Sequence, residues 1–527
     1  MPKFIFITGG VVSGIGKGFT AASIGRLFKA RGFNVRLFKM DPYFNVDTRH
    51  MSPLQHGEVY VTDDGSETDM CIGHYERILG RRMTENTGIT TGQVYWEVLS
   101  HERNGDYDGG TVQVIPHITN AIKQHIYDAV QDADILITEI GGTIGDIESQ
   151  PFIEAIREVS SENGLHDTAF VHMTLMPFIE SSGELKSKPT QHSVKELLGI
   201  GVQPDVLICR TEKPVDEDMR KKISLFCNVR PQDVIPNEFV DNEYEVPLLL
   251  EKAGLTDALS YHLRLEKRTP DLASWEQMIE KQRNASGNVT VGIVGNYVQM
   301  HDAYHSVVEA LSHGAAENGT NVEIKWIPTS DIEQKGAAAS VYGCDGIVAV
   351  AGLREDGFEQ FVAVAKYVRE CDIPFLAIDV AMQAAAVELA RNLVGMSEAG
   401  STEFGNCEDI LIDAVRDENG KARFRIGAGN CTIVDGTRMA AVYGEKTVSE
   451  RHRCKYGLDP AFERVFNKAG IVFSMISDDN TAVEAIEIPS CRWYTAVQFL
   501  PQFTSRPNHP HPIMVDFIRE LKASSNH

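Results

Sequence analysis

The feature of this sequence that most constrains its fold is a repeated alternation of short apolar runs and helical patterns. The first half contains the apolar runs "KFIFITGG", "FNVRLFKM", "DILITEIGG", "TAFVHMTLM" and "VLICRT", with helix-like segments such as "GFTAASIGRLFKARG" between them. Strands that alternate with helices form βαβ units, which build a parallel sheet covered by helices on both faces. A second series runs through "NVTVGIVGNYV", "NVEIKWIP", "DGIVAVAG" and "IPFLAI". The sequence therefore predicts an α/β protein with two doubly wound parallel-sheet domains.

A polar segment separates the two series. The stretch "LEKRTPDLASWEQMIEKQRNASGN" contains a proline and few apolar residues, which is typical of a linker around a short helix. The chain of 527 residues also exceeds what one hydrophobic core usually supports. We therefore expect a first domain at residues 1–268, a linker at 269–288 and a second domain at 289–527.

Composition and charge exclude several classes of protein. The net charge of −24 works against sequence-independent binding of nucleic acid, which needs clustered positive charge. No apolar run approaches the roughly 18 residues of a membrane span, and the opening "MPKFIFITGG" lacks the pattern of a secretory leader. The nine cysteines include no C-x-x-C pair, which argues against a disulfide framework or zinc knuckle. We expect a cytoplasmic protein with small-molecule ligands.

A glycine-rich loop directly follows the first predicted strand. In "TGGVVSGIGKGFTAAS" the backbone N–H groups of the loop and the N-terminus of the next helix can surround phosphate oxygens, and Lys17 adds a full positive charge. The spacing from Gly10 to Gly16 is one residue longer than in the usual P-loop, and Gly18 stands where the magnesium-binding hydroxyl normally lies. The stretch is therefore a deviant P-loop.

Two further charged residues end two other predicted strands. Lys39 lies in "FKMDPYFNVD" and Glu139 in "ITEIGGTIGDIES". Ligands of open parallel sheets bind outside the carboxyl ends of the strands, so Lys17, Lys39 and Glu139 should converge on one crevice. A carboxylate there can hold Mg²⁺ against phosphates. The polar stretch "GELKSKPTQHSVKE" could bind a second phosphate group.

The motifs together resemble the CTP synthase family. "TGGVVSGIGKG", "KMDPYFNVD", "SPLQHGEVYVTDDG", "GHYER", "TVQVIPHITNAIK", "EIGGTIGDIES" and "KSKPTQHSVKELL" look like its synthetase domain over about the first 265 residues, and the remainder is similar to its class I glutamine amidotransferase domain. The resemblance implies a dethiobiotin-synthetase-like P-loop fold followed by a flavodoxin-like fold. It also implies that ATP phosphorylates O4 of UTP, with Mg²⁺ as cofactor, that ammonia displaces the phosphate to give CTP, and that the protein is a homotetramer.

Residue roles follow from the resemblance position by position. Lys17 and Lys39 would bind the ATP phosphates and the transferred phosphoryl group, and Glu139 would be a magnesium ligand. His56 and His117 would line the path of ammonia. The other ATP-binding residues would be Ser13, Gly14, Ile15, Gly16 and Gly18. The pyrimidine nucleotide would contact Ser13, Asp146, Glu148, Lys186, Lys188, Gln191 and Lys222.

One departure from the family pattern concerns the metal. The family has an aspartate ligand two residues before the glycine of "GHYER", and this chain has Cys71. A thiol is a poor ligand for Mg²⁺, which prefers oxygen. Either Asp69, on the same face if this piece is extended, replaces the missing carboxylate, or the affinity for the metal falls.

The second domain departs more widely. A buried strand and the next helix meet in "FLAIDVAMQ", where amidotransferases mount a nucleophilic cysteine, and this chain has Asp379. Leu500 and Gln502 of "QFLPQF" replace the family histidine and glutamate, so every triad member is absent. The oxyanion loop is "VAGLREDG", with Ala351, Leu353, Arg354, Glu355 and Asp356 at altered positions. Lys455 replaces an arginine, a glycine-rich segment before "GAGNC" is missing, and only Glu403 keeps its place among the glutamine contacts.

Three functions fit these observations. The first is an ATP-dependent ligase that makes CTP from UTP with free ammonia, or with ammonia from a separate protein, because its own glutaminase is lost. The second keeps phosphorylation at C4 but uses another amine. The third is a catalytically silent paralogue that assembles with an active CTP synthase. Intact Lys17, Lys39 and Glu139 argue against the third, and Cys71 keeps it open.

Overall fold

The computed structural model describes residues 2–49, 51–352, 356–405, 407–417 and 419–525. Two compact units make up the chain. The first contains the residues up to Thr48 together with His74–Ser274, and the second contains Arg49–Gly73 together with the residues from Trp275 onward. The expected linker includes helix α11 (Ala273–Arg283), at whose start the chain passes from one unit to the other.

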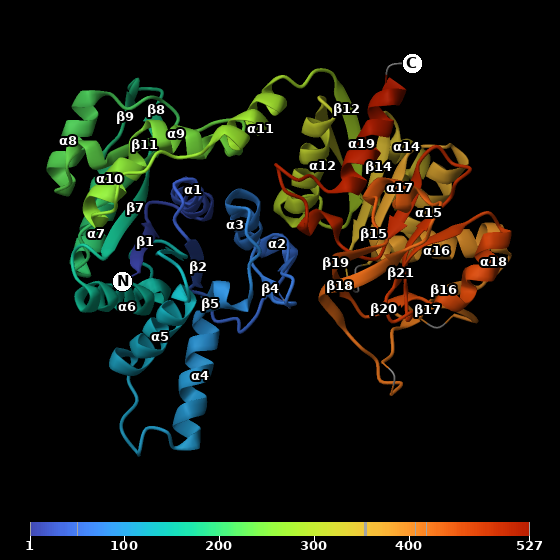
Figure 1. The fold of residues 1–527 in the computed structure, drawn as a ribbon, viewed down its shortest axis with the longest axis horizontal. Helices are drawn as coiled ribbons and strands as arrows, with labels where there is room; N and C mark the ends of the chain where they lie inside the picture. Colours follow the sequence, from blue (N-terminus) through green and yellow to red (C-terminus); the bar gives the residue numbers. More distant parts are fainter. Residues whose placement is uncertain (1, 50, 353–355, 406, 418, 526–527) are drawn as a thin grey trace. The chain divides into compact units, whose positions relative to one another are not determined.

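The first unit is built on a seven-stranded sheet in the order β11-β10-β7-β1-β6-β2-β5 (Figure 1). Every neighbouring pair is parallel, which confirms the sequence prediction for this half. The strands are β1 (Lys3–Gly9), β2 (Val35–Asp41), β5 (Gly88–Thr90), β6 (Ile135–Ile140), β7 (Thr168–Met176), β10 (Val206–Thr211) and β11 (Val234–Glu238).

Helices cover both faces of this sheet. Gly25 of α1 faces Leu37 of β2 and Ile137 of β6. The adjacent residues of those two strands, Phe38 and Leu136, belong to a core cluster with α5 and α6. Successive strand residues point to opposite faces, so α1 lies on one face and α5 and α6 on the other. The main helices are α1 (Lys17–Lys29), α3 (Cys71–Leu79), α4 (Thr91–Asn104), α5 (Thr119–Val130), α6 (Gln150–Asn163), α7 (Lys188–Gly199), α8 (Glu217–Cys227), α9 (Val246–Lys252) and α10 (Leu255–Leu263).

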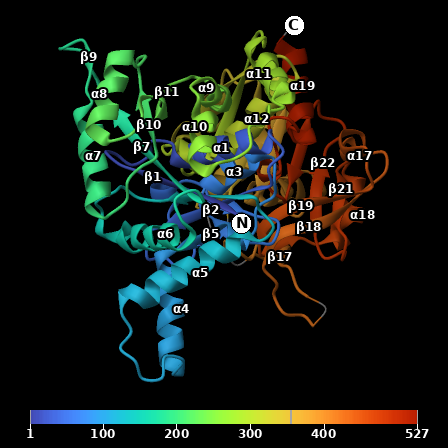
Figure 2. The ribbon, with the colours of Figure 1, turned by 60° about the vertical axis from the view of Figure 1, so that its left-hand side comes forward.

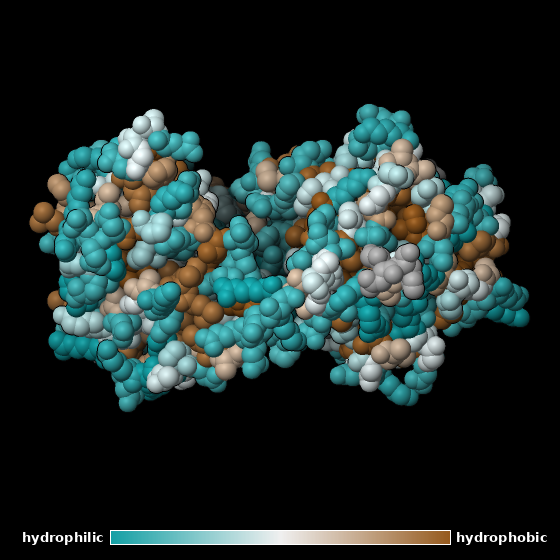
Figure 3. All heavy atoms as spheres, turned by 90° about the horizontal axis from the view of Figure 1, so that it is seen from above, coloured by the Kyte–Doolittle hydropathy of each residue, from teal (hydrophilic) through white to brown (hydrophobic). Residues whose placement is uncertain are grey.

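Helix α4 extends away from the sheet of its own unit in both ribbon views (Figures 1 and 2). It exposes two large apolar side chains, Trp96 at 68% and Leu99 at 54%. The surface in Figure 3 is mostly hydrophilic, with apolar residues in small groups. None of the helices in the described ranges combines the length and the apolar character that crossing a membrane requires.

The second unit contains a twelve-stranded sheet with the path β13-β12-β14-β15-β23-β22-β20-β17-β16. Strands β13, β12, β14, β15 and β23 pair in parallel, as expected. The strands on the path are β12 (Asn288–Gly295), β13 (Asn321–Pro328), β14 (Gly346–Ala351), β15 (Phe375–Asp379), β16 (Ala399–Ser401), β17 (Asp409–Ala414), β20 (Tyr456–Leu458), β22 (Val483–Glu487) and β23 (Tyr494–Val497).

The rest of this unit adds antiparallel strands, so its sheet is mixed and its parallel part is the predicted doubly wound core. Strands β18 (Arg425–Ile433), β19 (Thr447–Cys454), β21 (Val472–Ser477) and β22 pair antiparallel. Residues 478–482 alone connect β21 to β22. A connection this short cannot hold the crossover that parallel neighbours need, so the chain reverses direction.

Two helix pairs cover the faces of the parallel part. Helices α15 (Phe358–Glu370) and α16 (Val380–Leu389) share a core cluster with Ile347. Gly346, the preceding residue of β14, lies against Phe517 of α19 (Pro512–Ser525), which packs on α12 (His305–Glu317). Shorter helices are α13 (Thr329–Lys335), α14 (Ala337–Val341), α17 (Arg438–Tyr443) and α18 (Glu463–Lys468).

Residues 49–73, which we call the docking segment, pack with the second unit, although we expected them in the domain at 1–268. The segment contains α2 (Pro53–His56), β3 (Tyr60–Val61) and β4 (Glu67–Thr68). Arg451 of β19 is 1% exposed and donates hydrogen bonds to Asp63 (2.5 Å), the Tyr60 hydroxyl (3.0 Å) and Val61 O (3.0 Å). Long-range ion pairing of this kind is invisible to sequence periodicity, which is why the domain boundary differs.

Glu58 makes a second anchor for the docking segment. Its carboxylate is buried and accepts hydrogen bonds from the backbone N–H and hydroxyl of Ser306. A third contact joins Arg453 Nε to Glu67 Oε1 at 2.8 Å. Three charged contacts therefore fix this segment to the second unit.

We expect Arg451→Ala to destabilise the second unit by about 3 kcal/mol, because removing one partner of a buried pair leaves the other groups unsatisfied. Arg423→Ala is the matched control. Arg423 pairs with Asp479 at 2.9 Å, but the two side chains are 50% and 39% exposed, so its loss should cost less than about 1 kcal/mol. Calorimetric unfolding of both variants measures the difference, and equal effects would contradict the role of Arg451.

Candidate active site

The loop after β1 brings phosphate-binding groups to one end of the first sheet. Val11 and Gly16 adopt positive φ values of 77° and 84°, and Gly16 caps the N-terminus of α1. A Cβ on Gly9 would lie 2.7 Å from Lys17 Cδ, so the lysine side chain runs back over the end of β1. Its Nζ donates a hydrogen bond to Gly142 O, in the loop after β6. The remaining predicted ATP contacts lie in this loop and the first turn of α1: Ser13, Gly14, Ile15 and Gly18.

Lys39 and Glu139 are register partners in the neighbouring strands β2 and β6. Both are buried, at 5% and 4% exposure. Lys39 Nζ lies 3.3 Å from Asp41 Oδ1, and the Tyr75 hydroxyl donates a hydrogen bond to Glu139 Oε2. The structure thus places Lys17, Lys39 and Glu139 at the same edge of one sheet. Charges buried this deeply need partners, and Asp41 and Tyr75 are among the partners present here.

Tyr75 and Asp41 are contacts that the sequence analysis missed. Tyr75 lies on α3 and is fully buried. The motif "GHYER" contains it, but nothing in the spacing of that motif shows that the hydroxyl reaches a carboxylate on β6. Asp41 stands two residues after Lys39, and its carboxylate also accepts a hydrogen bond from Tyr43 at 3.2 Å.

The predicted pyrimidine-binding residues form two groups. Lys186 and Lys222 surround Glu184, whose pKa they lower, Lys186 through a hydrogen bond and Lys222 through charge alone. Lys188 begins α7, and Gln191 is buried on the same helix, donating to Ser187 Oγ at 3.1 Å. The second group, Asp146 and Glu148, is exposed in the loop after β6, where Asp146 accepts a hydrogen bond from Thr143 N at 3.2 Å.

The two predicted metal positions at residues 69 and 71 do not lie in an extended piece. Cys71 is the first residue of helix α3, and its backbone N–H donates to Asp69 Oδ1 at 2.8 Å. The condition on which Asp69 and Cys71 would share one face of a strand is therefore not met, because the chain turns into a helix here. The Asp69 carboxylate caps that helix, which is a common use of aspartate.

The two histidines of the predicted ammonia path belong to different units. His56 ends α2 in the docking segment and is exposed. His117 lies in a helical turn at Val114–Ile118, where its Nδ1 accepts a hydrogen bond from Gln113 N at 3.1 Å and its ring meets Tyr107 edge-on. Their role in carrying ammonia stays a prediction.

In the second unit, Asp379 occupies a strained corner between β15 and α16. Its φ of 57° and ψ of −121° are rare for any residue except glycine. The side chain is 3% exposed, and its Oδ1 accepts a hydrogen bond from Gln498 Nε2 at 2.8 Å. The strand-to-helix corner predicted from the sequence is present. The residue at this corner is an aspartate whose carboxylate accepts a hydrogen bond from the Gln498 amide.

Leu500 and Gln502 follow β23, which pairs with β15 beside the corner. Leu500 is 6% exposed and contributes its backbone N–H to Arg451 O at 2.8 Å. Gln502 is 5% exposed, and its Oε1 accepts no hydrogen bond from the described residues.

Of the predicted oxyanion loop, Ala351 is the register partner of Asp379, whereas Leu353, Arg354 and Glu355 lie outside the described residues. Asp356 O accepts from Asn296 at 2.6 Å.

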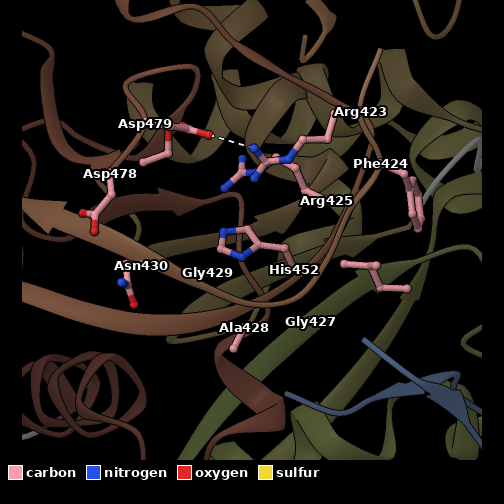
Figure 4. Close-up of a pocket in the computed structure, with 12 residues that line it drawn as sticks. Arg423, Phe424, Arg425, Gly427, Ala428, Gly429, Asn430, His452, Asp478 and Asp479 are labelled. Carbon is pink, nitrogen blue, oxygen red and sulfur yellow. Dashed lines mark hydrogen bonds and ion pairs between the residues drawn. The ribbon is translucent and has the colours of Figure 1, made fainter. Parts of the chain in front are cut away.

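A polar pocket of about 280 Å³ opens between β18, β19 and the residues after β21 (Figure 4). The guanidinium groups of Arg423 and Arg425 and the ring of His452 lie at its centre in that view. Beneath it, Glu484 binds Arg425 and, at 2.9 Å, His452 Nε2. Ligand atoms of Cys431, His452 and Glu484 lie within 4.8 Å of one another. Both Glu484 oxygens are already bound, and burial raises the pKa of Cys431, so the cluster is an internal ion-pair network.

Comparison with known proteins identifies the family of both halves of the chain. The family described as "CTP synthase N-terminus" matches residues 3–265, and "Glutamine amidotransferase class-I" matches residues 299–520. A CTP synthase of Ruminiclostridium cellulolyticum is 49% identical over 524 residues, which cover 98% of each chain. CTP synthases of Clostridium beijerinckii and Symbiobacterium thermophilum are each 47% identical, again over 98% of both chains. This protein therefore belongs to the CTP synthase family.

Proposed function

We propose that this protein is an ATP-dependent ligase that converts UTP to CTP and takes its nitrogen from ammonia. The observation that carries the proposal is the arrangement of Lys17, Lys39 and Glu139 at one sheet edge, in a chain that aligns along nearly its whole length with CTP synthases. Two buried charges beside a phosphate-type loop are suited to phosphoryl transfer, which depends on positioning and charge stabilisation.

The reaction would proceed in two steps. O4 of UTP attacks the γ-phosphorus of ATP, the bond to the β-γ bridging oxygen breaks, and ADP leaves. The N3–H proton of the uracil ring is lost to the surrounding water as O4 is phosphorylated. Ammonia then attacks C4, the C4–O4 bond breaks, inorganic phosphate leaves with that electron pair, and the nitrogen loses one proton to the surrounding water. Lys17 and Lys39 stabilise charge on the oxygens of the transferred group, and the pyrimidine nucleotide is held by α7 and the loop after β6.

Glu139 fits the metal that such a reaction needs. Its carboxylate ends a buried strand, beside Lys39 and within the reach of Tyr75, and carboxylate oxygen is the ligand type that Mg²⁺ prefers. When bound, Mg²⁺ would neutralise part of the phosphate charge. We propose Glu139 as one ligand of this metal.

We further propose that the second unit has lost glutaminase activity. The corner residue Asp379 has no thiol, its carboxylate is bound to Gln498, and Leu500 cannot act as a base. What the unit retains is its fold and the anchors of the docking segment, which carries His56, Asp69 and Cys71.

The expected homotetramer and cytoplasmic location stay predictions. The alternatives to CTP formation are separated by two measurements. If the protein releases no ADP with UTP and ammonium, it is a silent relative. If it releases ADP but mass spectrometry shows a product other than CTP, it uses another amine.

Lys17→Ala should lower turnover of UTP with ATP, Mg²⁺ and ammonium by about a hundredfold or more, because a full charge on the transferring phosphoryl group is lost. Lys267→Ala is the control, since that side chain is 81% exposed and pairs only with an exposed carboxylate. The rate of ADP release measures turnover in both variants. A folded Lys17→Ala variant with nearly normal turnover would overturn the assignment of the phosphate loop.

Cys71→Asp should reduce the Mg²⁺ concentration needed for half-maximal turnover, because it adds an oxygen ligand close to Asp69. Cys71→Ser removes the thiol without adding a carboxylate and should leave that concentration unchanged. Magnesium titrations of steady-state turnover compare the three proteins. An unchanged or higher requirement in Cys71→Asp would mean that other oxygens already complete the metal shell.

Nitrogen in the product should come from ammonium and not from glutamine. With ¹⁵N-ammonium or ¹⁵N-amide glutamine as the source, only the first should label CTP, and turnover at fixed total ammonium should rise with pH as more NH₃ forms. The triple change Asp379→Cys, Leu500→His and Gln502→Glu should recover little glutaminase, because Ala351 and the altered loop leave the oxyanion site incomplete. Efficient label transfer from glutamine in the unmodified protein would refute the loss of this activity.

A further inference from the structure

A buried histidine lies between the two nucleotide sites of the first unit. His172 is in the middle of β7, where it is the register partner of Thr8 on β1 and of Leu207 on β10. Its side chain is fully buried. Nothing in the proposed phosphoryl or amino transfer uses it, so its burial within the sheet needs a separate explanation.

Both ring nitrogens of His172 are hydrogen-bonded to hydroxyl groups. Nδ1 lies 2.8 Å from Thr8 Oγ1, and Nε2 lies 2.8 Å from Ser193 Oγ. Burial and the positive charge of Lys17 lower the pKa of His172 to about 3, so the ring is neutral at physiological pH. A neutral imidazole has one N–H and one lone pair, and it therefore donates to one hydroxyl and accepts from the other.

The Thr8 end of this chain of hydrogen bonds belongs to the phosphate loop. Thr8 is followed directly by Gly9 and Gly10, the first residues of that loop. Gly10 N donates to Met173 O at 3.0 Å, immediately after His172. A Cβ on Gly10 would lie only 1.7 Å from Ser193 Oγ, so the loop and the Ser193 side chain are in direct contact.

The Ser193 end belongs to helix α7. This helix begins at Lys188 and carries Gln191, both predicted to contact the pyrimidine nucleotide. One turn nearer its N-terminus, Thr190 Oγ1 lies 2.9 Å from Thr174 Oγ1 of β7, and both hydroxyls are fully buried. A shift of α7 would therefore break buried hydrogen bonds to the same strand.

We propose that His172 is a positioning residue that holds the phosphate loop in fixed relation to α7 and thereby couples binding of the ATP phosphates to binding of the pyrimidine nucleotide. This inference rests on the proposed function. In-line phosphoryl transfer requires the two nucleotides at a set separation, and misplacement by about 1 Å can cost about a hundredfold in rate. The ring supplies that spacing because it bridges the two hydroxyls with no flexible atom between them.

The test is a binding cycle by calorimetry with a non-hydrolysable ATP analogue and UTP, each alone and each in the presence of the other. His172→Phe keeps the ring volume and removes both hydrogen bonds. In the unmodified protein, UTP should strengthen binding of the analogue by about fivefold or more. In His172→Phe this factor should fall to near one, and turnover with ammonium should fall with it, while each nucleotide alone binds almost as before.

His313→Phe is the matched control. His313 is also buried and hydrogen-bonded to a serine hydroxyl, Ser505 at 3.0 Å, but it lies on α12 in the second unit. The His313→Phe variant should keep the full coupling factor, which is the factor by which UTP strengthens binding of the ATP analogue. Ser193→Ala, which removes one of the two hydrogen bonds, should lower the factor partly. If His172→Phe does not fold, His172→Asn and Ser193→Ala carry the test, and an unchanged factor in both overturns the proposal.

The remaining outcomes also decide between the two proposals. If the unmodified protein binds both nucleotides and turns over, but His172→Phe keeps the coupling factor, the positioning role is wrong and the proposed function stands. If the unmodified protein binds both without any coupling, the positioning role is equally wrong. If it binds neither nucleotide, the proposed function fails, and the inference that rests on it fails too.

Discussion

The parallel pairing of β1, β6 and β2 is the constraint on which the candidate active site depends. Parallel strands end at the same edge of a sheet, so residues at the ends of strands far apart in sequence become neighbours. The register partners Lys39 and Glu139 are adjacent for this reason alone. The loop after β1 reaches the same edge, and Lys17 closes the arrangement by binding the loop after β6. The backbone hydrogen bonds of one sheet and the loops that follow its strands thus position Lys17, Lys39 and Glu139, the charged residues of the proposed phosphoryl transfer.

The docking segment is held in the second unit by charged contacts. The buried guanidinium of Arg451 donates hydrogen bonds to a carboxylate, a hydroxyl and a carbonyl of this segment. Glu58 is held in the same way by Ser306. Buried charges have few alternative partners, so these contacts determine where the segment packs.

In the amidotransferase-like unit, the backbone geometry of the strand-to-helix corner is present without a cysteine at that position. The corner at Asp379 keeps a backbone conformation that costs free energy in any residue except glycine. Surrounding strands hold it there, because Asp379 pairs in register with Ala351 and its side chain is bound by Gln498. The strained corner is a property of the fold and remains when the reactive group differs. Fold similarity alone therefore does not establish the reaction.

The sequence by itself determined the α/β class and predicted the two domains and the phosphate loop, because hydrophobic periodicity and glycine spacing are local properties. It also placed Lys17, Lys39 and Glu139 at one edge, since the rule for parallel strands needs only their order. Tertiary structure alone decided the antiparallel half of the second sheet, the assignment of residues 49–73 to the second unit, and the helix that begins at Cys71. It alone revealed Tyr75 and the bridge through His172. Most of these features arise from side chains that are distant in sequence, such as Tyr75 and Glu139 or His172 and Thr8, or from the direction in which a short connection turns the chain. Neither leaves a periodic pattern in the sequence.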